Sequence, residues 1–119
     1  MTRSAEAARR AVAASRGEIW WVNLDPTVGS EIRKTRPAVD LTTNSLNRVR
    51  STVVVVPLSN GPRARAPIVV ATPSAGSASV AVCDQLRSVD KARLTARIGS
   101  LSMADLRQVE QGVRTVLAL

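Results

Sequence analysis

Four consecutive valines lie within the segment Thr52–Leu58 (TVVVVPL) and constrain the fold more than any other feature of this chain. A short, continuous run of β-branched residues is typical of a strand that is buried on both faces. Such a strand needs packed layers on each side, and 119 residues supply one domain with one core. We therefore expect a small, β-rich single domain built around this strand.

Shorter runs of β-forming residues predict the rest of the sheet. We expect strands at 18–24, 37–43, 67–72, 79–83 and 97–101, and the run at 79–83 could continue to residue 88. Segments rich in Pro, Gly, Ser and charged residues predict loops at 25–36, 60–66 and 73–78, and the first is long enough to suggest a functional loop. Residues 44–51 form a turn or a short helix, and 90–95 a single helical turn.

One amphipathic helix is predicted over 102–117, because apolar residues recur there at helical spacing. The stripe consists of Met103, Leu106, Val109, Val113, Val116 and Leu117. Ser102 and Asp105 have the spacing of a capping box at the start of this helix. The stripe serves core packing or a dimer contact. The predicted fold class is mostly β with a C-terminal helix, in the form of a small SH3-like antiparallel barrel.

Residues 1–16 are rich in Ala and Arg and have no turn chemistry, so we interpret them as a disordered or frayed helical extension of a domain at 17–119. No apolar stretch approaches the roughly 20 residues of a membrane span, and no uninterrupted apolar segment suggests a secretory signal. The single cysteine, Cys83, lies in an apolar run and is interpreted as a small buried hydrophobe. These features favour a cytoplasmic location without membrane association.

The chain is strongly basic, with 17 Lys and Arg residues against nine Asp and Glu and a formal charge of +8. Arginine forms bidentate contacts with phosphate and stacks on bases, so the composition favours a polyanionic partner. Biased codon usage is the alternative explanation of so many arginines.

The residue inventory excludes several kinds of enzyme. The chain has no histidine and one cysteine, which argues against zinc sites and against Ser–His–Asp or Cys–His nucleophile systems. No phosphate-binding glycine motif is present, and no pair of carboxylates has convincing metal-ligand spacing. We expect neither a metal nor a cofactor. RNA cleavage is compatible with the side chains that remain, because RNA carries its own nucleophile, the 2′-OH. The products of such a cleavage are a 2′,3′-cyclic phosphate and a 5′-OH end.

Five blocks of the sequence, in order, resemble the MazF/PemK family of toxin endoribonucleases. The first is the run at 16–37, RGEIWWVNLDPTVGSEIRKTRP. The others are 52–59 (TVVVVPLS), 83–87 (CDQLR), 90–94 (DKARL) and 98–102 (IGSLS). The resemblance covers about residues 16–119. It implies a barrel of the CcdB/MazF type, a homodimer with an RNA groove across its interface, sequence-specific cleavage of single-stranded RNA such as mRNA, and a cognate antitoxin that occupies the groove.

The resemblance also implies roles for single residues. Arg36 matches the family's catalytic arginine, and Ser59 stands where the family usually has a catalytic threonine. Replacing Thr by Ser keeps the hydroxyl donor and loses a methyl group. Candidate substrate-binding residues are Ser30, Glu31, Asn47, Arg63, Gln85 and Arg87. Residues 60–78 match no family block and are expected to influence which RNA sequence is cut.

Each of these residues also has an ordinary structural interpretation. Arg36 could be a surface ion-pair partner of Glu31, and Ser59 a strand-end hydroxyl. Asp40 departs from the usually apolar strand after Arg36, and either faces solvent or pairs with an arginine. Trp20 and Trp21 point to opposite faces of one strand, so one belongs to the core while the other lies at a dimer surface or stacks on a base, with core or interface favoured.

Two other functions compete with RNA cleavage at this stage. A non-enzymatic toxin on the same barrel could bind DNA gyrase, as CcdB does, and would not need Arg36 and Ser59 at one phosphate. A basic barrel could also bind nucleic acid passively.

Overall fold

The structure is a computed structural model of the chain, and it describes residues 13–25, 28–31 and 34–119. Among these residues there are two α-helices, α2 (Asn44–Asn47) and α3 (Met103–Leu117). The strands are β1 (Glu18–Asn23), β2 (Thr35–Asp40), β3 (Thr52–Ser59), β4 (Val69–Ala71), β5 (Val80–Val82), β6 (Arg87–Asp90) and β7 (Leu94–Ser100). Three single 3-10 turns complete the fold, η1 (Pro73–Ala75), η2 (Cys83–Gln85) and η3 (Lys91–Arg93).

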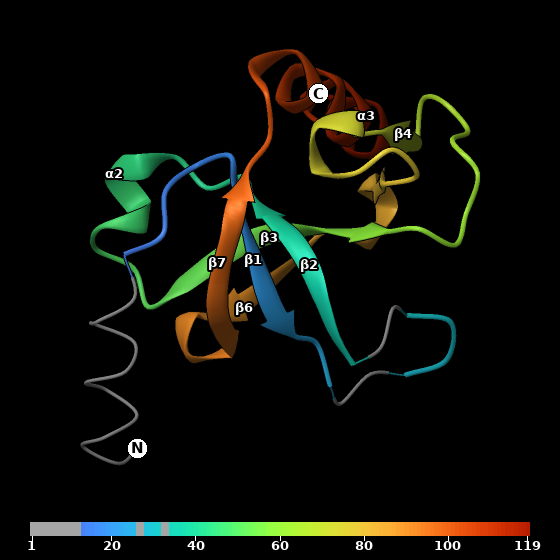
Figure 1. Cartoon of the computed structure of the whole chain (residues 1–119). Coiled ribbons are helices and arrows are strands. Elements are labelled where there is room, and N and C mark those ends of the chain that lie inside the picture. The colour runs from blue at the N-terminus through green and yellow to red at the C-terminus, as the bar shows by residue number, and fades with distance from the viewer. Residues whose placement is uncertain (1–12, 26–27, 32–33) are drawn as a thin grey trace.

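The seven strands form one antiparallel sheet in the order β4-β5-β3-β2-β1-β7, with β6 paired to the first half of β3. Figure 1 shows α3 at one end of the molecule and the loop between β1 and β2 at the other. The predicted class, mostly β with a C-terminal helix, is confirmed. The sheet is open, because no ladder joins β7 to β4 or β6 among the strands described, so the expected barrel is not closed.

The expected strands are present in the expected order, but β6 is an additional strand and some boundaries move. β2 runs from Thr35 to Asp40 instead of 37–43, so Arg36 belongs to the strand and not to the preceding loop. The possible continuation after residue 83 is a separate strand, β6, reached through the η2 turn. Thr43 precedes a short helix, α2, and the single helical turn expected at 90–95 is η3.

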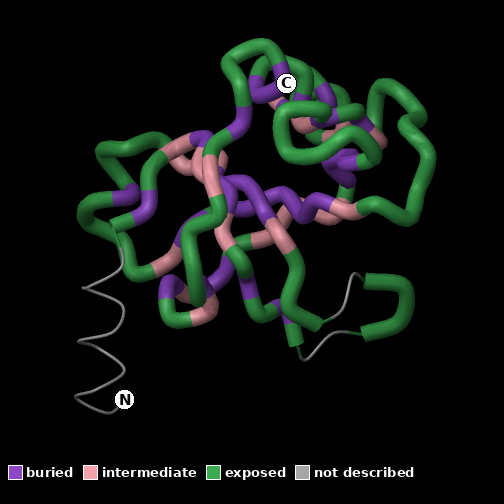
Figure 2. Tube along the Cα trace, in the orientation of Figure 1, coloured by how far each residue is buried: buried purple, intermediate pink, exposed green. Residues whose placement is uncertain are grey.

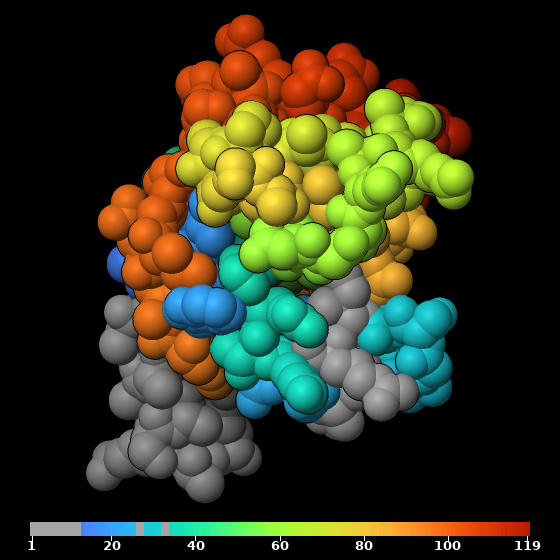
Figure 3. Space-filling model, turned by 45° about the vertical axis from the view of Figure 1, so that its right-hand side comes forward, coloured from blue at the N-terminus to red at the C-terminus, as the bar shows by residue number. Residues whose placement is uncertain are grey.

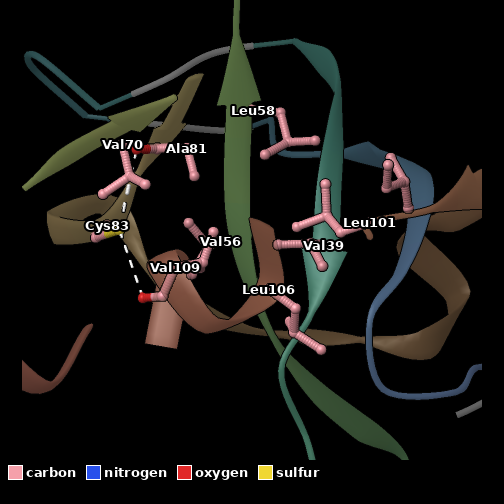
Figure 4. Close-up of a cluster of buried hydrophobic side chains, with 10 residues drawn as sticks. Val39, Val56, Leu58, Val70, Ala81, Cys83, Leu101, Leu106 and Val109 are labelled. Carbon is pink, nitrogen blue, oxygen red and sulfur yellow. Dashed lines mark hydrogen bonds between the residues drawn. The ribbon is translucent and has the colours of Figure 1, made fainter. Parts of the chain in front are cut away.

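β3 lies between two apolar clusters, as its valine run predicts. Val56 and Leu58 belong to the cluster that packs against α3 (Figure 4), while Val53 and Val55 belong to the cluster on the other side of the sheet. Val54 is 36% exposed and interrupts the pattern. Buried segments alternate with exposed loops along the rest of the trace (Figure 2). Within the part of the chain that is described, no helix is long and apolar enough to span a membrane.

Cys83 is a core residue, as predicted. Its side chain is fully buried, and its thiol lies 3.8 Å from the carbonyl oxygen of Val109 in α3 (Figure 4). Burial raises the pKa of the Cys83 thiol to about 11, with a smaller contribution from the negative charge of Asp84. The thiol therefore stays protonated and unreactive at neutral pH.

α3 begins at the predicted cap, with one change. The Ser102 hydroxyl accepts a hydrogen bond from the Asp105 backbone N–H at 3.1 Å. In the usual capping box the residue at the Asp105 position would accept from the Ser102 N–H. Here the Ser102 N–H donates to the Ser74 hydroxyl at 3.0 Å, and that hydroxyl donates to the Asp105 carboxylate. Ser74 therefore completes the cap and fastens η1 to α3.

The ordered domain begins before residue 17. Ala14 is 7% exposed and packs in the cluster that contains Val22 and Val53. The Arg16 guanidinium donates to the carbonyl of Leu41 and to the carboxylate of Glu110 in α3. Ala14 and Arg16 therefore pack on the domain that the sequence analysis begins at residue 17. The rest of the expected extension, residues 1–12, lies outside the described residues.

Asp40 neither faces solvent nor forms an ion pair, which corrects both expectations. It is 1% exposed, and one carboxylate oxygen accepts from the Thr42 backbone N–H at 2.8 Å. The other oxygen has no hydrogen-bond partner, and neither has the side-chain oxygen of buried Asn47. Burial raises the pKa of Asp40, while the hydrogen bond from Thr42, the nearby Asn47 side chain and the positive charge of Arg16 oppose the rise.

The close packing of α3 generates a first prediction. A Cβ on Gly112 would lie 2.5 Å from the Cys83 sulfur and 2.8 Å from the Pro67 carbonyl oxygen. Gly112→Ala should therefore lower the free energy of unfolding by about 1–3 kcal/mol, although the same change in an open helix stabilises by about 1 kcal/mol. Gly99→Ala is the control, because no atom lies within 4 Å of its Cβ position. Urea denaturation measures both, and an unchanged Gly112→Ala midpoint would contradict this packing.

Asp40 generates a second prediction, on pH. Because its pKa is raised in the folded state, the folded protein binds this proton more tightly than the unfolded chain. The stabilisation is present at low pH and is lost as the pH rises through the raised pKa. Asp40→Asn removes this titration and supplies an N–H beside Asn47. The free energy of unfolding of Asp40→Asn, measured relative to that of wild type, should therefore increase from acid to neutral pH by on the order of 1 kcal/mol. Thermal unfolding across pH 4–8 tests this, and parallel curves would count against it.

Candidate active site

The proposed catalytic pair lies where β2 and β3 separate. The Leu41 N–H donates to the Val54 carbonyl at 2.9 Å, which marks these two residues as a hydrogen-bonded pair. Hydrogen-bonded pairs alternate along an antiparallel ladder. The alternation assigns Val39–Val56 as the next such pair and Pro37–Leu58 as the one after it. Pro37 has no N–H to donate, so the ladder with β2 ends, while the opposite edge of β3 pairs with β5 through Leu58 and Ser59.

Arg36 and Ser59 are the residues just beyond this break. The last recorded β2–β3 pair is Ala38–Pro57, and Arg36 and Ser59 each lie two residues further along their antiparallel strands. The two residues therefore lie at the same end of the β2–β3 ladder. Arg36 is exposed and its backbone is paired with Val22 of β1, while Ser59 is partly buried.

Four of the predicted substrate-binding residues surround one hollow of about 230 Å³, which we call the Gln85 hollow. Ser30 and Glu31 reach it from the loop between β1 and β2, Gln85 from η2 and Arg87 from the start of β6. Pro57 of β3 lies in its wall. Residues from three distant parts of the sequence therefore converge beside the end of β3, as the resemblance predicts.

A second hollow, of about 310 Å³, lies on the opposite face of β3, because adjacent residues Pro57 and Leu58 line one hollow each. We call it the Trp21 hollow. Trp21 and Ile98 form part of its apolar lining, and Ser59 and Asn60 stand at the end of β3 beside it. In Figure 3 this face shows blue atoms of β1 between the orange β7 and the teal β2, below the yellow η1. The carboxyl end of β3 thus separates two hollows.

The base of the loop between β1 and β2 is held by two arginines. Arg87 donates to the carbonyl of Leu24 at 3.3 Å, and Arg93 donates to the carbonyls of Asn23, at 3.0 Å, and Asp25. Across the loop base, the Leu24 N–H donates to the Lys34 carbonyl at 3.0 Å. Arg87 therefore has a structural bond in addition to its place in the Gln85 hollow.

The loop itself is shaped by its own polar groups. One carboxylate oxygen of Glu31 accepts from the Val28 N–H at 2.6 Å, and the Asp25 carboxylate accepts from the Lys34 N–H at 2.9 Å. Lys34 has a φ of +66°, a strained conformation for a residue with a side chain, directly before β2. Glu31 folds back on the loop that carries it, so part of its charge is used to hold the loop.

Two of the predicted substrate-binding residues do not join the site. Asn47 is 3% exposed in α2, where its side-chain amide N–H donates to the Thr42 carbonyl and its backbone carbonyl accepts from buried Lys91. A side chain so enclosed cannot contact RNA, and we assign it a structural role. Arg63 is exposed in the loop after Ser59 but lines neither hollow.

Sequence reasoning missed two residues of this region, Asp84 and Arg93, and left the place of Trp21 open. Asp84 lines the Gln85 hollow, and its position next to Gln85 in the matched block was the available signal. Arg93 was read only as part of a helical turn. Trp21 was assigned to a core, an interface or a base, and it proves 41% exposed beside the Trp21 hollow, whereas Trp20 packs against the core. Across the described residues, no group of three or more potential metal ligands occurs.

The fold and site define a class of protein: a small basic β-sheet protein whose strand end carries Arg and Ser between two hollows. Residues 15–117 match the family described as PemK-like, MazF-like toxins of type II toxin–antitoxin systems. The chain is 39% identical to endoribonuclease PemK of Escherichia coli over 92% of this chain and 86% of that protein. It is 33% identical to endoribonuclease MazF9 of Mycobacterium tuberculosis over 87% and 96%. The chain belongs to this PemK/MazF toxin family.

Solved structures support the fold. MazF of Deinococcus radiodurans superposes with a TM-score of 0.80 at 24% identity, over 91% of this chain and 99% of that one. An endoribonuclease of a mycobacterial species, solved in complex with its cognate antitoxin, gives a TM-score of 0.73 at 21% identity, over 90% and 97%.

The arginine contacts at the loop base generate a third prediction. Arg93→Ala removes a charged donor from two carbonyls, so the loop base should open more often. The amide protons of Leu24 and Lys34 should exchange with solvent about tenfold faster, the scale of one charge-assisted hydrogen bond. Arg107→Ala, at an exposed position on α3, is the matched control. Native-state hydrogen exchange gives the result, and unchanged exchange at both amides would show that Arg93 does not restrain the loop.

Proposed function

We propose that this protein is an endoribonuclease toxin that cuts single-stranded RNA, with Arg36 and Ser59 acting on one phosphodiester bond. The observation that carries this proposal is the shared position of the two residues, each two residues past the last β2–β3 pair. The family match and the endoribonuclease relatives support the class of reaction. The formal charge of +8 supports a polyanionic substrate.

The chemistry uses the nucleophile that RNA provides. The 2′-OH attacks the adjacent phosphorus, the bond from phosphorus to the 5′-oxygen breaks, and the products are a 2′,3′-cyclic phosphate and a 5′-OH end. The Arg36 guanidinium neutralises the charge that develops on the phosphorane oxygens. The Ser59 hydroxyl accepts from the Gly61 N–H at 3.3 Å, and its own proton is donated to a non-bridging oxygen.

Residues of the Gln85 hollow hold the RNA on one side of the cut. The Gln85 amide can donate and accept, as reading a base edge requires. Arg87 supplies positive charge, and Ser30 and Glu31 form the loop side of the hollow. Arg63 guides phosphates from the exposed loop after Ser59, and residues 60–78 influence the recognised sequence.

The family description names a toxin–antitoxin system. We propose that a cognate antitoxin neutralises this toxin by covering the same surface. A homodimer remains a prediction, and exposed apolar side chains are available for it. Met103 of the predicted helix stripe is 65% exposed and Leu117 is 48% exposed, so two members of that stripe do not pack in the core of a single chain. Action on mRNA places the protein in the cytoplasm.

A cleavage map tests the proposal. Purified protein is incubated with a long transcript in excess EDTA, and the new ends are mapped. Discrete cuts with 5′-OH ends, retained in EDTA, are expected. Intact RNA, or cuts that require added metal, would contradict the mechanism.

Variants assign the cuts to the site. Arg36→Ala should abolish them, and Ser59→Ala should slow them by about 10²-fold or more. Ser59→Thr restores the hydroxyl and should be neutral or better. Arg48→Ala is the control, because Arg48 is exposed at the end of α2, away from both hollows. Full activity in Arg36→Ala would remove Arg36 from the reaction.

A further inference from the structure

The Trp21 hollow has chemistry that the proposed cleavage reaction does not use. Trp21 is 41% exposed, and Ile98 of β7, on the same lining, is 48% exposed. The cross-strand neighbours of Trp21 are Pro37 on β2 and Ala96 on β7, whose side chains are too short to cover an indole. A large aromatic surface therefore stays open to solvent within a hollow of about 310 Å³.

The polar groups at this hollow divide into two sets. Ser74 and Ser79 are already bound within the fold, Ser74 to Asp105 and Ser79 to the Thr72 hydroxyl at 2.9 Å. The groups at the end of β3 still have hydrogen-bonding capacity. The Asn60 amide is exposed and has no recorded partner within the described chain, and the Ser59 hydroxyl only accepts. The available hydrogen-bonding capacity is thus next to the proposed catalytic hydroxyl.

The hollow contains no charged side chain among the residues described as lining it, whereas the Gln85 hollow contains Glu31, Asp84 and Arg87. An uncharged hollow with an indole surface and one free amide suits a flat, neutral, aromatic ligand with hydrogen-bonding edges. A phosphate has none of these properties. A nucleobase has all of them, and bases of single-stranded RNA stack on aromatic side chains in this way.

We propose that the Trp21 hollow is a nucleobase subsite, which takes the base of one nucleotide next to the scissile phosphate. The base stacks on Trp21 and presents its edge to Asn60. This inference rests on the proposed function, because the phosphate held at Arg36 and Ser59 brings the neighbouring base to the end of β3. The two hollows lie on opposite faces of β3, so the bases on the two sides of the cut splay apart around the strand end.

The test combines protein variants with base removal. Substrates are short oligoribonucleotides containing a mapped cleavage site, either intact or abasic at one of the two nucleotides flanking the cut. Trp21→Ala should raise KM for the intact substrate by about tenfold, the scale of one stacked base, and change kcat less. Trp21→Phe should recover much of the loss. At one of the two flanking positions, removing the base should weaken binding to the wild-type protein. The same removal should change binding to Trp21→Ala very little, because that variant has already lost the stacking contact.

Fluorescence gives an independent readout. Trp20→Phe leaves Trp21 as the single tryptophan. Its emission should be quenched when a 2′-O-methyl oligoribonucleotide with the same site binds, and much less by the abasic version. Wild-type KM in Trp21→Ala, or equal abasic losses in both proteins, would overturn the subsite while RNA cleavage, and hence the proposed function, stands. Emission that changes with protein concentration and not with RNA would also overturn it, in favour of an interface between copies of the chain.

Discussion

The missing N–H of Pro37 determines where the candidate site lies. The ladder between β2 and β3 would next form a hydrogen-bonded pair at Pro37 and Leu58, and proline cannot donate that bond. On its other edge Pro37 faces Trp21 of β1 in a pair that needs no N–H, so β2 stays attached to β1. β3 therefore loses its pairing with β2 at this point and keeps its pairing with β5 on the opposite edge, which leaves the β2-facing edge of Ser59 open at the same end of the ladder as Arg36.

The loop between β1 and β2 depends on contacts from a later segment of the chain. Its base is closed by the backbone bond between Leu24 and Lys34, and Arg87 and Arg93 hold the carbonyls next to it. Both arginines lie in the segment 87–93, which runs from β6 through η3. The loop that carries Ser30 and Glu31 is thus positioned by residues more than fifty positions later in the chain, and the Gln85 hollow forms only when both segments are in place.

The sequence predicted the strands, the helix and its cap because those patterns are local. It could not predict that Arg36 lies inside a strand, because Pro37 looks like a strand start until the direction of its missing N–H is known. It could not predict the burial of Asp40 and Asn47, since their enclosure depends on Arg16 and Lys91, which are distant in sequence. The resemblance at Asn47 carried no information about what surrounds this side chain. Its burial overturned the substrate-binding role that the resemblance implied.

The two hollows differ in charge and lie on opposite faces of β3. Glu31, Asp84 and Arg87 line one of them, whereas the lining around Trp21 carries no charged side chain among the residues described. The nucleotides on the two sides of one phosphodiester therefore meet different chemistry. Ser59 is at the end of the strand that divides them, and Arg36 is on the neighbouring strand. A single short strand can therefore set both the place of cleavage and the directions in which the flanking bases leave.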